Sequence, residues 1–336
     1  MRVQVPGRRV TSADVARAAG VSRTTVSYVL NNTAHQKIPQ ETRQRVLEAA
    51  ARLAYAPSAA ARALRTGRTD TVLCLLPDWP ISPTIGALLE HLSAALAADG
   101  LMLVVHPRSR HTRPISDVWK AITPAAVVAF EDFARDEAAA MRAAGIEVIV
   151  SLLGRSGRGR DFGIRQQRSG TLQAEHLAAA GHHRLGYAFP DDERVHGFAR
   201  PRLGGVRRAC ADLGLDEPVV LTVPLDATAA AEAVRAWRAA APPVTGVCCF
   251  NDNTALAVLA GMRLLGLRAP HDLAVVGVDD IAAARLADPP LTTVATDMRA
   301  LAVHIAGRIS AALGGDARPP SRPDPEMLHL VRRCSA

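Results

Sequence analysis

From Thr71 onward, short apolar runs of strand length alternate with amphipathic stretches of helix length. The runs are VLCLLP, LMLVVHP, AAVVAF, IEVIVSLL, RLGYAFP, VVLTV, GVCCF and LAVVGVD. Strands that are apolar along their whole length lie in parallel sheets covered by helices on both faces. There are too many strand–helix units for one small sheet, so two α/β subdomains are predicted. The expected helices span Ile85–Ala98, Glu137–Ala144, Thr171–Ala180, Arg202–Leu213, Ala229–Ala240 and Thr254–Leu265.

Residues directly after the predicted strands are the candidates for a binding pocket. In folds of this kind, ligands bind beyond the carboxyl ends of the strands. For Asp252 and Asp280, capping of the following helix is the alternative interpretation. The full set of pocket candidates is Asp78, Trp79, His106, Glu131, Pro190, Asn251, Asp252, Asp279 and Asp280.

A different pattern occupies residues 11–31, TSADVARAAGVSRTTVSYVLN. Thr11 and Asp14 predict a capping box at the start of one helix. Gly20 ends that helix, because glycine enters the left-handed conformation without steric cost. Ser22 then caps a second helix. Two helices joined by so short a turn are typical of the helix-turn-helix, whose second helix enters the DNA major groove, although an ordinary helical hairpin is the alternative.

The second helix is expected to bury Val26, Val29 and Leu30, which leaves a polar outer side. Arg23 and Thr24 lie at its N-terminal end, which meets base edges in such motifs. Arginine can form a bidentate contact with guanine, and threonine can bond a base or touch a thymine methyl group. The candidate DNA contacts in this segment are Thr11, Ser22, Arg23, Thr24, Thr25, Ser27, Tyr28 and Asn31.

A third helix is predicted from Gln40 to about Leu53. Its apolar residues would close a small three-helix core with the two helices before it. These residues are Val46, Leu47, Ala50 and Leu53.

The positive charge of the chain is concentrated in this same segment. Residues 1–68 hold 12 Lys and Arg against 3 Asp and Glu, whereas the remainder holds 28 against 29. A basic surface confined to one small domain is typical of nucleic-acid binding. A solvated charged surface is the alternative, but it does not explain so uneven a distribution.

Composition excludes several other classes of protein. The chain is 49% hydrophobic and 21% charged, which is typical of a globular protein and not of a disordered one. No apolar run reaches the ~20 residues that a membrane span needs, and MRVQVPGRRV lacks the apolar core of a signal peptide. We therefore expect a cytoplasmic protein that is associated with the nucleoid.

The five cysteines stand in apolar runs without a CxxC pair. Buried free thiols are therefore predicted, and neither a metal nor a cofactor is expected.

The segment YAPSAAARALRTG, which ends at Gly67, predicts a very short helix. Pro57 blocks a helix before it, Ser58 can cap it, and Gly67 can end it. Fewer than two turns are marginal in water without a partner. This helix would form when docked on DNA and on its twin from a second subunit; a plain linker is the alternative.

The sequence resembles the lactose-repressor (LacI/GalR) family of bacterial transcription regulators over nearly its whole length. The most specific part is DVARAAGVSRTTVSYVLN with the trailing YAPSAAARALRTGRT. Further matching segments are EHLAAAGHHRLGYAF, FNDNTA, DLAVVGVDD, PPLTTV and LHLVRRCS.

The resemblance implies a homodimer on double-stranded DNA that carries a palindromic operator. Each recognition helix would read one half-site through Arg23, Thr24 and Tyr28, although the family often carries arginine at the position of Tyr28. The helix Ser58–Leu64 resembles the hinge helix of the family. Leu64 would then enter the minor groove as a wedge that kinks the duplex, with Ala61 and Arg65 lining the groove.

The resemblance also implies an α + α/β architecture. A helix-turn-helix DNA-binding domain would span residues 1–56, and a hinge helix and linker 57–69. Residues 70–336 would form an effector-binding and dimerisation domain that resembles periplasmic sugar-binding proteins. Its N-subdomain would comprise about 70–163 plus 296–318, and its C-subdomain about 164–295 plus 319–336.

By position, the resemblance assigns Arg202, Asn251 and Asp279 to the binding of a small-molecule effector. Trp79 or Phe250 would stack on an apolar face of that ligand. The family usually has an Asp-Asn type pair before the position of Gly170, where this chain has Gln166-Gln167. The preceding GRSGRGRD is unusually basic. We therefore predict an effector other than a plain neutral hexose, with an anionic or phosphorylated sugar as the candidate.

Three alternatives are weighed against a ligand-gated repressor. An enzyme would need a nucleophile–base pair, and GRSGRG lacks the Lys-Ser/Thr end of a Walker loop. A periplasmic binding protein would carry a signal peptide and no helix-turn-helix. A regulator with a vestigial pocket, which binds DNA without any effector, stays open.

Overall fold

The computed structural model describes residues 10–30, 38–55, 69–108, 114–146, 148–152, 166–314 and 327–336. Two compact units are present, Met1–Thr69 and Asp70–Ala336. The predicted hinge helix, the basic segment 154–161 and the DNA candidates Asn31, Ser58, Ala61, Leu64 and Arg65 lie outside the described residues.

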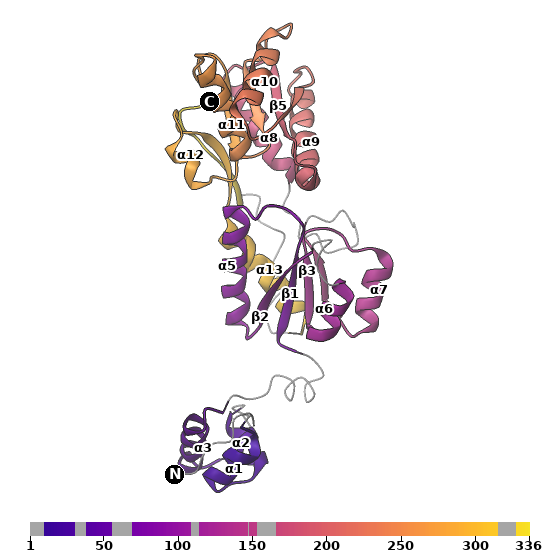
Figure 1. The fold of residues 1–336 in the computed structure, drawn as a ribbon, viewed down its shortest axis with the longest axis vertical. Helices are drawn as coiled ribbons and strands as arrows, with labels where there is room; N and C mark the ends of the chain where they lie inside the picture. The colour runs from indigo at the N-terminus through magenta and orange to yellow at the C-terminus, as the bar shows by residue number, and fades with distance from the viewer. Residues whose placement is uncertain are drawn as a thin grey trace. The chain divides into compact units, whose positions relative to one another are not determined.

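The first unit contains the three predicted helices, α1 (Ser12–Ala19), α2 (Arg23–Leu30) and α3 (Gln40–Arg52) (Figure 1). The Asp14 carboxylate accepts hydrogen bonds from the backbone N–H and the hydroxyl of Thr11, at 3.0 and 2.7 Å. Gly20 adopts φ 66°, the left-handed conformation predicted for it. The buried core consists of Val15, Ala16, Ala19, Val26, Val29, Val46, Ala49 and Ala50.

The predicted apolar stripe of α3 is wrong at one position. Leu47 is 44% exposed, and Ala49 is buried instead. Residues 46, 49, 50 and 53 follow the i, i+3, i+4, i+7 spacing of one helix face, from which Leu47 is rotated by about 100°. The small side chains of Ala49 and Ala50 lie in the core in its place.

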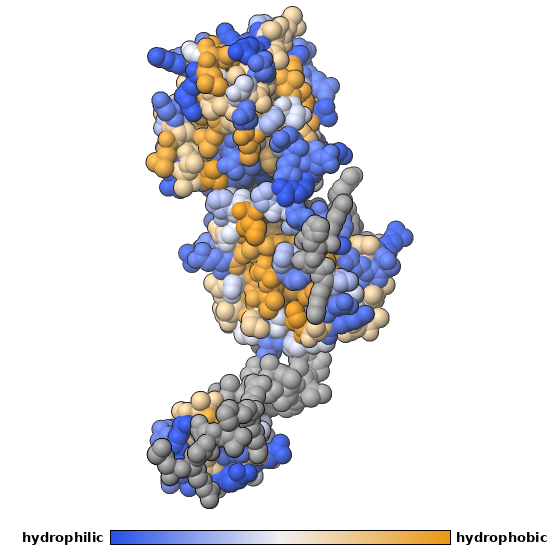
Figure 2. Space-filling model, in the orientation of Figure 1, coloured by the Kyte–Doolittle hydropathy of each residue, from blue (hydrophilic) through white to orange (hydrophobic). Residues whose placement is uncertain are grey.

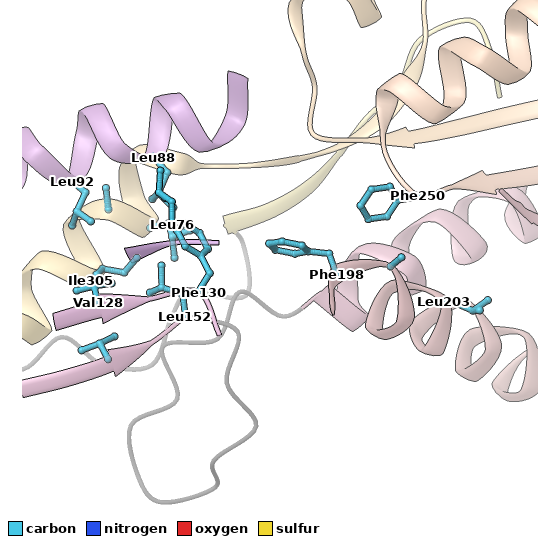
Figure 3. Close-up of a cluster of buried hydrophobic side chains, with 14 of the residues drawn as sticks. Leu76, Leu88, Leu92, Val128, Phe130, Leu152, Phe198, Leu203, Phe250 and Ile305 are labelled. Atoms are coloured by element: carbon cyan, nitrogen blue, oxygen red, sulfur yellow. The ribbon is translucent and has the colours of Figure 1, made fainter. Parts of the chain in front are cut away.

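The second unit has two subdomains, each built on its own sheet. We call the first the N-subdomain; its parallel sheet has the order β2-β1-β3-β4. Helices α5 and α13 cover one face with Leu88, Leu92 and Ile305, although α13 comes from the far end of the chain (Figures 1 and 3). Its elements are β1 (Thr71–Leu76), α5 (Pro83–Ala98), β2 (Met102–Pro107), α6 (Ile115–Ile122), β3 (Ala126–Ala129), α7 (Arg135–Ala143), β4 (Val148–Ser151) and α13 (Met298–Ala312).

The C-subdomain is built on a sheet of order β10-β9-β8-β7-β5-β6, parallel except for β10. Helices α8 and α9 pack in one apolar cluster, and α10 and α11 pack in another. Its elements are α8 (Gln166–Ala179), β5 (Leu185–Pro190), the 3-10 helix η1 (Glu193–Val195), α9 (His196–Asp212), β6 (Val219–Val223), α10 (Ala227–Ala239), β7 (Gly246–Cys249), α11 (Asp252–Leu264), β8 (Ala274–Val278), α12 (Ala282–Leu286), β9 (Thr292–Thr296) and β10 (Leu328–Val331).

Two helices begin well before their predicted starts. Helix α8 begins at Gln166 and not at the predicted Thr171. Helix α9 begins at His196 and continues through Pro201. Proline lacks an N–H and therefore leaves the carbonyl group four residues earlier without its helical partner, but the helix continues past it. Sequence patterns also did not predict α6.

One cysteine departs from the predicted burial. Cys74, Cys210, Cys248 and Cys249 are buried free thiols, but Cys334 is exposed. Burial raises the pKa of the Cys248 and Cys249 thiols well above 9. These two neighbouring side chains on β7 are therefore protonated residues of the core.

Helices α8 and α9 cross at two glycines that admit no side chain. A Cβ atom on Gly170 would lie 1.9 Å from the carbonyl oxygen of Arg202, and one on Gly205 would lie 1.8 Å from that of Gln167. Thr171 reinforces the crossing, because its hydroxyl donates to the carbonyl oxygen of Gly205 at 3.3 Å.

We predict that Gly205→Ala destabilises the protein by about 3 kcal/mol or more, because the new methyl group meets rigid backbone. Gly204→Ala is the matched control, since a Cβ there meets nothing within 4 Å. Alanine has a higher helix propensity than glycine, so Gly204→Ala should leave the free energy of unfolding unchanged or raise it by ~0.5–1 kcal/mol. Chemical denaturation measures both, and equal stabilities would contradict the close crossing.

Candidate functional site

The N-terminal end of α2 presents two exposed polar side chains, Arg23 and Thr24. The neighbouring candidates Ser22 and Thr25 bond each other at the start of the helix. The Ser22 hydroxyl accepts a hydrogen bond from the Thr25 backbone N–H at 3.0 Å and bonds the Thr25 hydroxyl at 2.9 Å. Ser22 thus caps α2, as Thr11 helps to cap α1. Ser27 and Tyr28 are half-buried farther along the helix.

A cavity of about 260 Å³ draws its walls from both subdomains of the second unit. This volume is near the lower end of small-molecule sites. Four of the predicted strand-end residues line it: Trp79, Pro190, Asn251 and Asp279. Arg202 and Phe250 line it too, so all five residues predicted to bind an effector meet at one cavity. The strand-end candidates outside its lining are Asp78, His106, Glu131, Asp252 and Asp280.

Arg202 is the cation of the cavity floor and is only 7% exposed. Its Nε donates to Gln166 Oε1 at 2.6 Å, and its Nη1 donates to the Phe250 carbonyl oxygen at 2.6 Å. Its Nη2 lies 3.4 Å from Asp279 Oδ1. The guanidinium also stands over the Phe250 ring, 5.0 Å from the centroid. Arg202, which the resemblance assigns to the effector, is therefore already paired inside the protein.

Asp279 reaches the cavity from a strained turn. It has φ 113° and Asp280 has φ 49°, conformations that residues with a Cβ rarely adopt. Burial raises the pKa of Asp279, while Arg202 opposes that shift. Asp280 turns away from the cavity lining and pairs with Arg333 at 2.5 Å.

Asn251 and Asp252 divide their roles. Asn251 is the N-cap of α11, because its Oδ1 accepts from the backbone N–H and the hydroxyl of Thr254, both at 3.0 Å. Asp252 is fully buried behind it. The Asp252 carboxylate accepts from the Thr293 hydroxyl at 2.6 Å and from the Ile281 N–H at 2.9 Å. Asp252 therefore braces the turn that carries Asp279 and does not cap the helix with its side chain.

Aromatic side chains connect the subdomains at the cavity wall. Trp79, which follows β1, makes edge-to-face contacts with Phe130 of its own subdomain and with Phe198 of α9. The ring centroids are 5.0 and 4.6 Å apart. Figure 3 shows Phe198 pointing from its helix toward the cluster that contains Phe130. Phe250 is 6% exposed, so Trp79 is the aromatic residue with more surface for a ligand.

Sequence patterns missed several residues of the lining. Gln166 is buried at the start of α8, Asp191 follows β5, and Leu225 follows β6. Trp79 and Asp279 were predicted because they follow strands. The same reasoning predicts Asp191 and Leu225 if the first two residues after each strand are counted as candidates. Gln166 does not follow a strand, and its partner Arg202 is 36 residues away. The sequence marks Gln166 only through the resemblance, which places Gln166-Gln167 where the family usually has an Asp-Asn type pair.

Within the part of the chain that the structure describes, no group of three or more His, Cys, Asp or Glu side chains could hold a metal ion. In the same described residues, each helix is too short or too polar to cross a bilayer.

Comparison with known proteins assigns the two units to known types. Residues 11–58 match bacterial regulatory proteins of the lacI family, and residues 174–336 match a periplasmic binding protein-like domain. The HTH-type transcriptional regulator GntR of Pseudomonas aeruginosa is 30% identical over 318 residues, which cover 91% of this chain and 90% of that protein. GalR of Escherichia coli is 28% identical, with 97% and 95% covered.

The chain belongs to the LacI family of bacterial regulatory proteins. It is therefore a transcriptional regulator and not an enzyme. Among solved structures, the complex of the regulator CelR with cellobiose is similar to this LacI-family chain with a TM-score of 0.66 and 26% identity, covering 98% of this chain and all of that one. A Lac repressor dimer bound to operator and the anti-inducer ONPF shares the fold, with a TM-score of 0.78, 23% identity, and 98% and 99% covered.

We predict that Asp252 of this LacI-family regulator lowers stability as the pH rises from about 4 to about 7. Burial raises the pKa of its carboxyl from 3.8 to about 7, although the hydrogen bonds from Thr293 and Ile281 oppose the shift. Between these values the folded chain holds a proton that the unfolded chain has released, so unfolding becomes easier as the pH rises.

Denaturation of the wild type and Asp252→Asn across this pH range measures the effect. Between pH 4 and pH 7 the free energy of unfolding of the wild type should fall by up to about 4 kcal/mol relative to that of Asp252→Asn. Each unit of pKa shift corresponds to about 1.4 kcal/mol. Asp212→Asn, at a side chain 69% exposed, is the control and should follow the wild type. Parallel profiles of Asp252→Asn and wild type would contradict the assignment.

Proposed function

We propose that this chain is a repressor that binds a palindromic operator as a homodimer and is gated by a small molecule in the cavity between its subdomains. One observation carries the proposal, namely that two features occur in the same chain. Arg23 and Thr24 are exposed at the start of the recognition helix, and a cavity with polar buried residues is lined by both subdomains. A ligand held by both subdomains changes their relative arrangement. Through this change in the arrangement of the subdomains, a ligand far from the DNA can change the affinity for DNA.

The operator is read through α2. Arg23 and Thr24 supply base contacts in each half-site, Tyr28 contacts a phosphate or a base, and Thr11, Ser22, Thr25, Ser27 and Asn31 contribute along the edge of the motif. The proposed division of the chain is 1–56 for DNA binding, 57–69 for the hinge and 70–336 for the effector and dimerisation. The hinge acts through Leu64 as a minor-groove wedge, with Ser58, Ala61 and Arg65 beside it.

The dimer is supported by an apolar edge of the N-subdomain. Strand β2 is the edge strand of its sheet, and Met102 and Val105 on it are 59% and 40% exposed. Figure 2 shows apolar surface around α5 and β2. Exposed apolar edge strands usually have a partner that covers them. A second copy of the chain would place two recognition helices on the two halves of a palindrome.

The effector is proposed to carry hydroxyl groups. Asp279 can accept hydrogen bonds from them, and Asn251 lines the same cavity. The CelR structure contains cellobiose, which is a relevant precedent for a sugar. Since Arg202 is already paired, an anionic sugar would depend on the basic segment 154–161. The competing proposal is a regulator that binds DNA without an effector, and a cavity that binds no sugar, sugar phosphate or nucleoside would favour it.

Selection of binding sites from random DNA tests the proposal. The wild type should enrich a palindrome, and Arg23→Ala should lose discrimination at one base pair in each half-site, by about 1–3 kcal/mol. Arg52→Ala is the control, because it removes the same charge from the exposed last turn of α3. Arg52→Ala should weaken binding to all DNA sequences about equally. Enrichment of a single half-site would contradict the dimer, and a uniform loss in Arg23→Ala would make Arg23 a phosphate contact.

We predict that Arg202→Ala keeps specific operator binding but no longer responds to effector. The substitution removes the bonds that hold Gln166, Asp279 and the end of β7 around the ligand. Operator binding is measured by fluorescence anisotropy with and without a ligand found by thermal-shift screening. Asp279→Asn, which keeps the shape and removes the charge, serves as the milder variant. A normal response of both variants would contradict the assignment of the cavity.

A further inference from the structure

A second cavity, of about 450 Å³, lies within the C-subdomain. Its lining comes from the last turns of α11, from the segment that follows this helix, and from two residues between α12 and β9. None of these residues lines the cavity around Arg202, which we now call the first cavity. The volume of the second cavity falls within the range of small-molecule sites, and the proposed function makes no use of it.

Helix α11 reaches from the first cavity to the second. Asn253 and Thr254 in its first turn line the first cavity, whereas Met262 and Arg263 near its end line the second. At ~1.5 Å per residue, Thr254 and Met262 are separated by ~12 Å along the helix axis. The two cavities are therefore distinct sites, and ligands in both would contact the same helix.

The buried part of the second cavity is apolar. Leu259, Met262 and Ala269 line it and are 2%, 1% and 9% exposed. All three belong to the apolar cluster that α10 and α11 share. A ligand that covers these side chains must therefore have apolar surface, and the thioether of Met262 can make favourable contact with an aromatic ring.

The exposed part of the second cavity carries two cations, Arg263 and Arg268. Arg263 Nη1 donates to the carbonyl oxygen of Asp288 at 3.3 Å, and Arg268 uses its backbone N–H to bond Asp272 Oδ2 at 2.8 Å. Among the residues that the structure describes, neither guanidinium forms an ion pair with a carboxylate. Arg202 of the first cavity, in contrast, is paired with Asp279.

The charge of the lining indicates a ligand with one negative charge. Asp288 is the acidic residue of the lining, so two arginines and one aspartate give it a net charge of +1. A monoanion neutralises this charge, whereas a doubly charged phosphate would leave an excess that Asp288 repels. Arginine is also well suited to a carboxylate, because its planar donors match the two carboxylate oxygens.

We propose that the second cavity binds a small monocarboxylate with an apolar body. The carboxylate pairs with the arginines at the exposed part, and the apolar body lies on Leu259 and Met262. The competing account is that Arg263 and Arg268 are solvated side chains at the rim of an empty hollow. That account predicts no preference for an anion over an uncharged molecule of the same shape.

The test compares benzoate with benzamide, its uncharged isostere, by saturation-transfer NMR titration of the full-length protein. Benzoate should bind with a dissociation constant of about 1 mM, the order of magnitude for so small a ligand. It should bind about fivefold tighter than benzamide, as expected for an exposed ion pair. In Arg263→Gln/Arg268→Gln this preference should disappear, while the affinity for benzamide is unchanged within about twofold.

Two controls locate the binding. Arg200→Gln/Arg285→Gln also removes two exposed arginines, but neither residue lines a cavity, so this variant should keep the fivefold preference. Arg202→Ala alters the first cavity and should still bind benzoate like the wild type.

Four results would overturn the inference. These are absence of benzoate binding at about 10 mM, equal affinities of benzoate and benzamide for the wild type, a preference that survives in Arg263→Gln/Arg268→Gln, and loss of benzoate binding in Arg202→Ala. The last result would place benzoate in the first cavity. Operator selection judges DNA recognition separately, so none of these results affects the proposed function.

Discussion

The bonds of the Arg202 guanidinium hold the floor of the cavity in one arrangement. One planar cation from α9 joins the side chain at the start of α8, the carbonyl end of β7 and the carboxylate that follows β8. A buried charge that loses one such partner costs about 3–5 kcal/mol. The floor is therefore preorganised, and a ligand need not arrange it. The close crossing of α8 and α9 at Gly170 and Gly205 is the condition for this, because it brings Arg202 beside Gln166.

The pairing of Arg202 also determines what kind of recognition the floor can offer. An unpaired buried arginine would attract an anion, whereas Arg202 beside Asp279 presents a neutral pair. The carboxylate is held in a strained turn, at a cost of about 1–3 kcal/mol. Asp252 offsets that cost by bonding Ile281 of the same turn and Thr293 of β9. Strand β9 leads directly into α13 of the N-subdomain, so the turn that carries Asp279 is bonded to the segment that connects the subdomains.

Sequence patterns predicted the features that depend on local spacing. The caps at Thr11 and Asp14, the end of α1 at Gly20, the alternation of strands and helices and the convergence of Trp79, Asn251 and Asp279 all follow from residues near in sequence or from strand ends. Arg202 was assigned only by the resemblance to the family. Other features did not follow. The start of α9 was concealed by Pro201, whose helix-breaking tendency is outweighed by the packing of Phe198, Ala199 and Leu203.

The same limit applies to the cavity. The bond between Gln166 and Arg202 joins residues far apart in sequence. Ile81 is equally invisible to local patterns, because it looks like an ordinary loop residue until the fold places it in the lining of the cavity. A hydropathy pattern identifies apolar residues, but only the fold shows which of them are exposed at a binding site.

The contact between Trp79 and Phe198 joins the two subdomains with a small interaction energy. An edge-to-face aromatic pair contributes about 0.5–1.5 kcal/mol beyond the surface that it buries. Allosteric couplings are typically 1–3 kcal/mol, so one such contact between subdomains can shift an equilibrium of arrangements without fixing it. Both rings also line the cavity, so a ligand that covers Trp79 acts on the contact directly. The floor around Arg202 is rigid, whereas the wall at Trp79 is held weakly across the subdomain boundary. A change in the arrangement of the subdomains therefore costs less at this wall than at the floor.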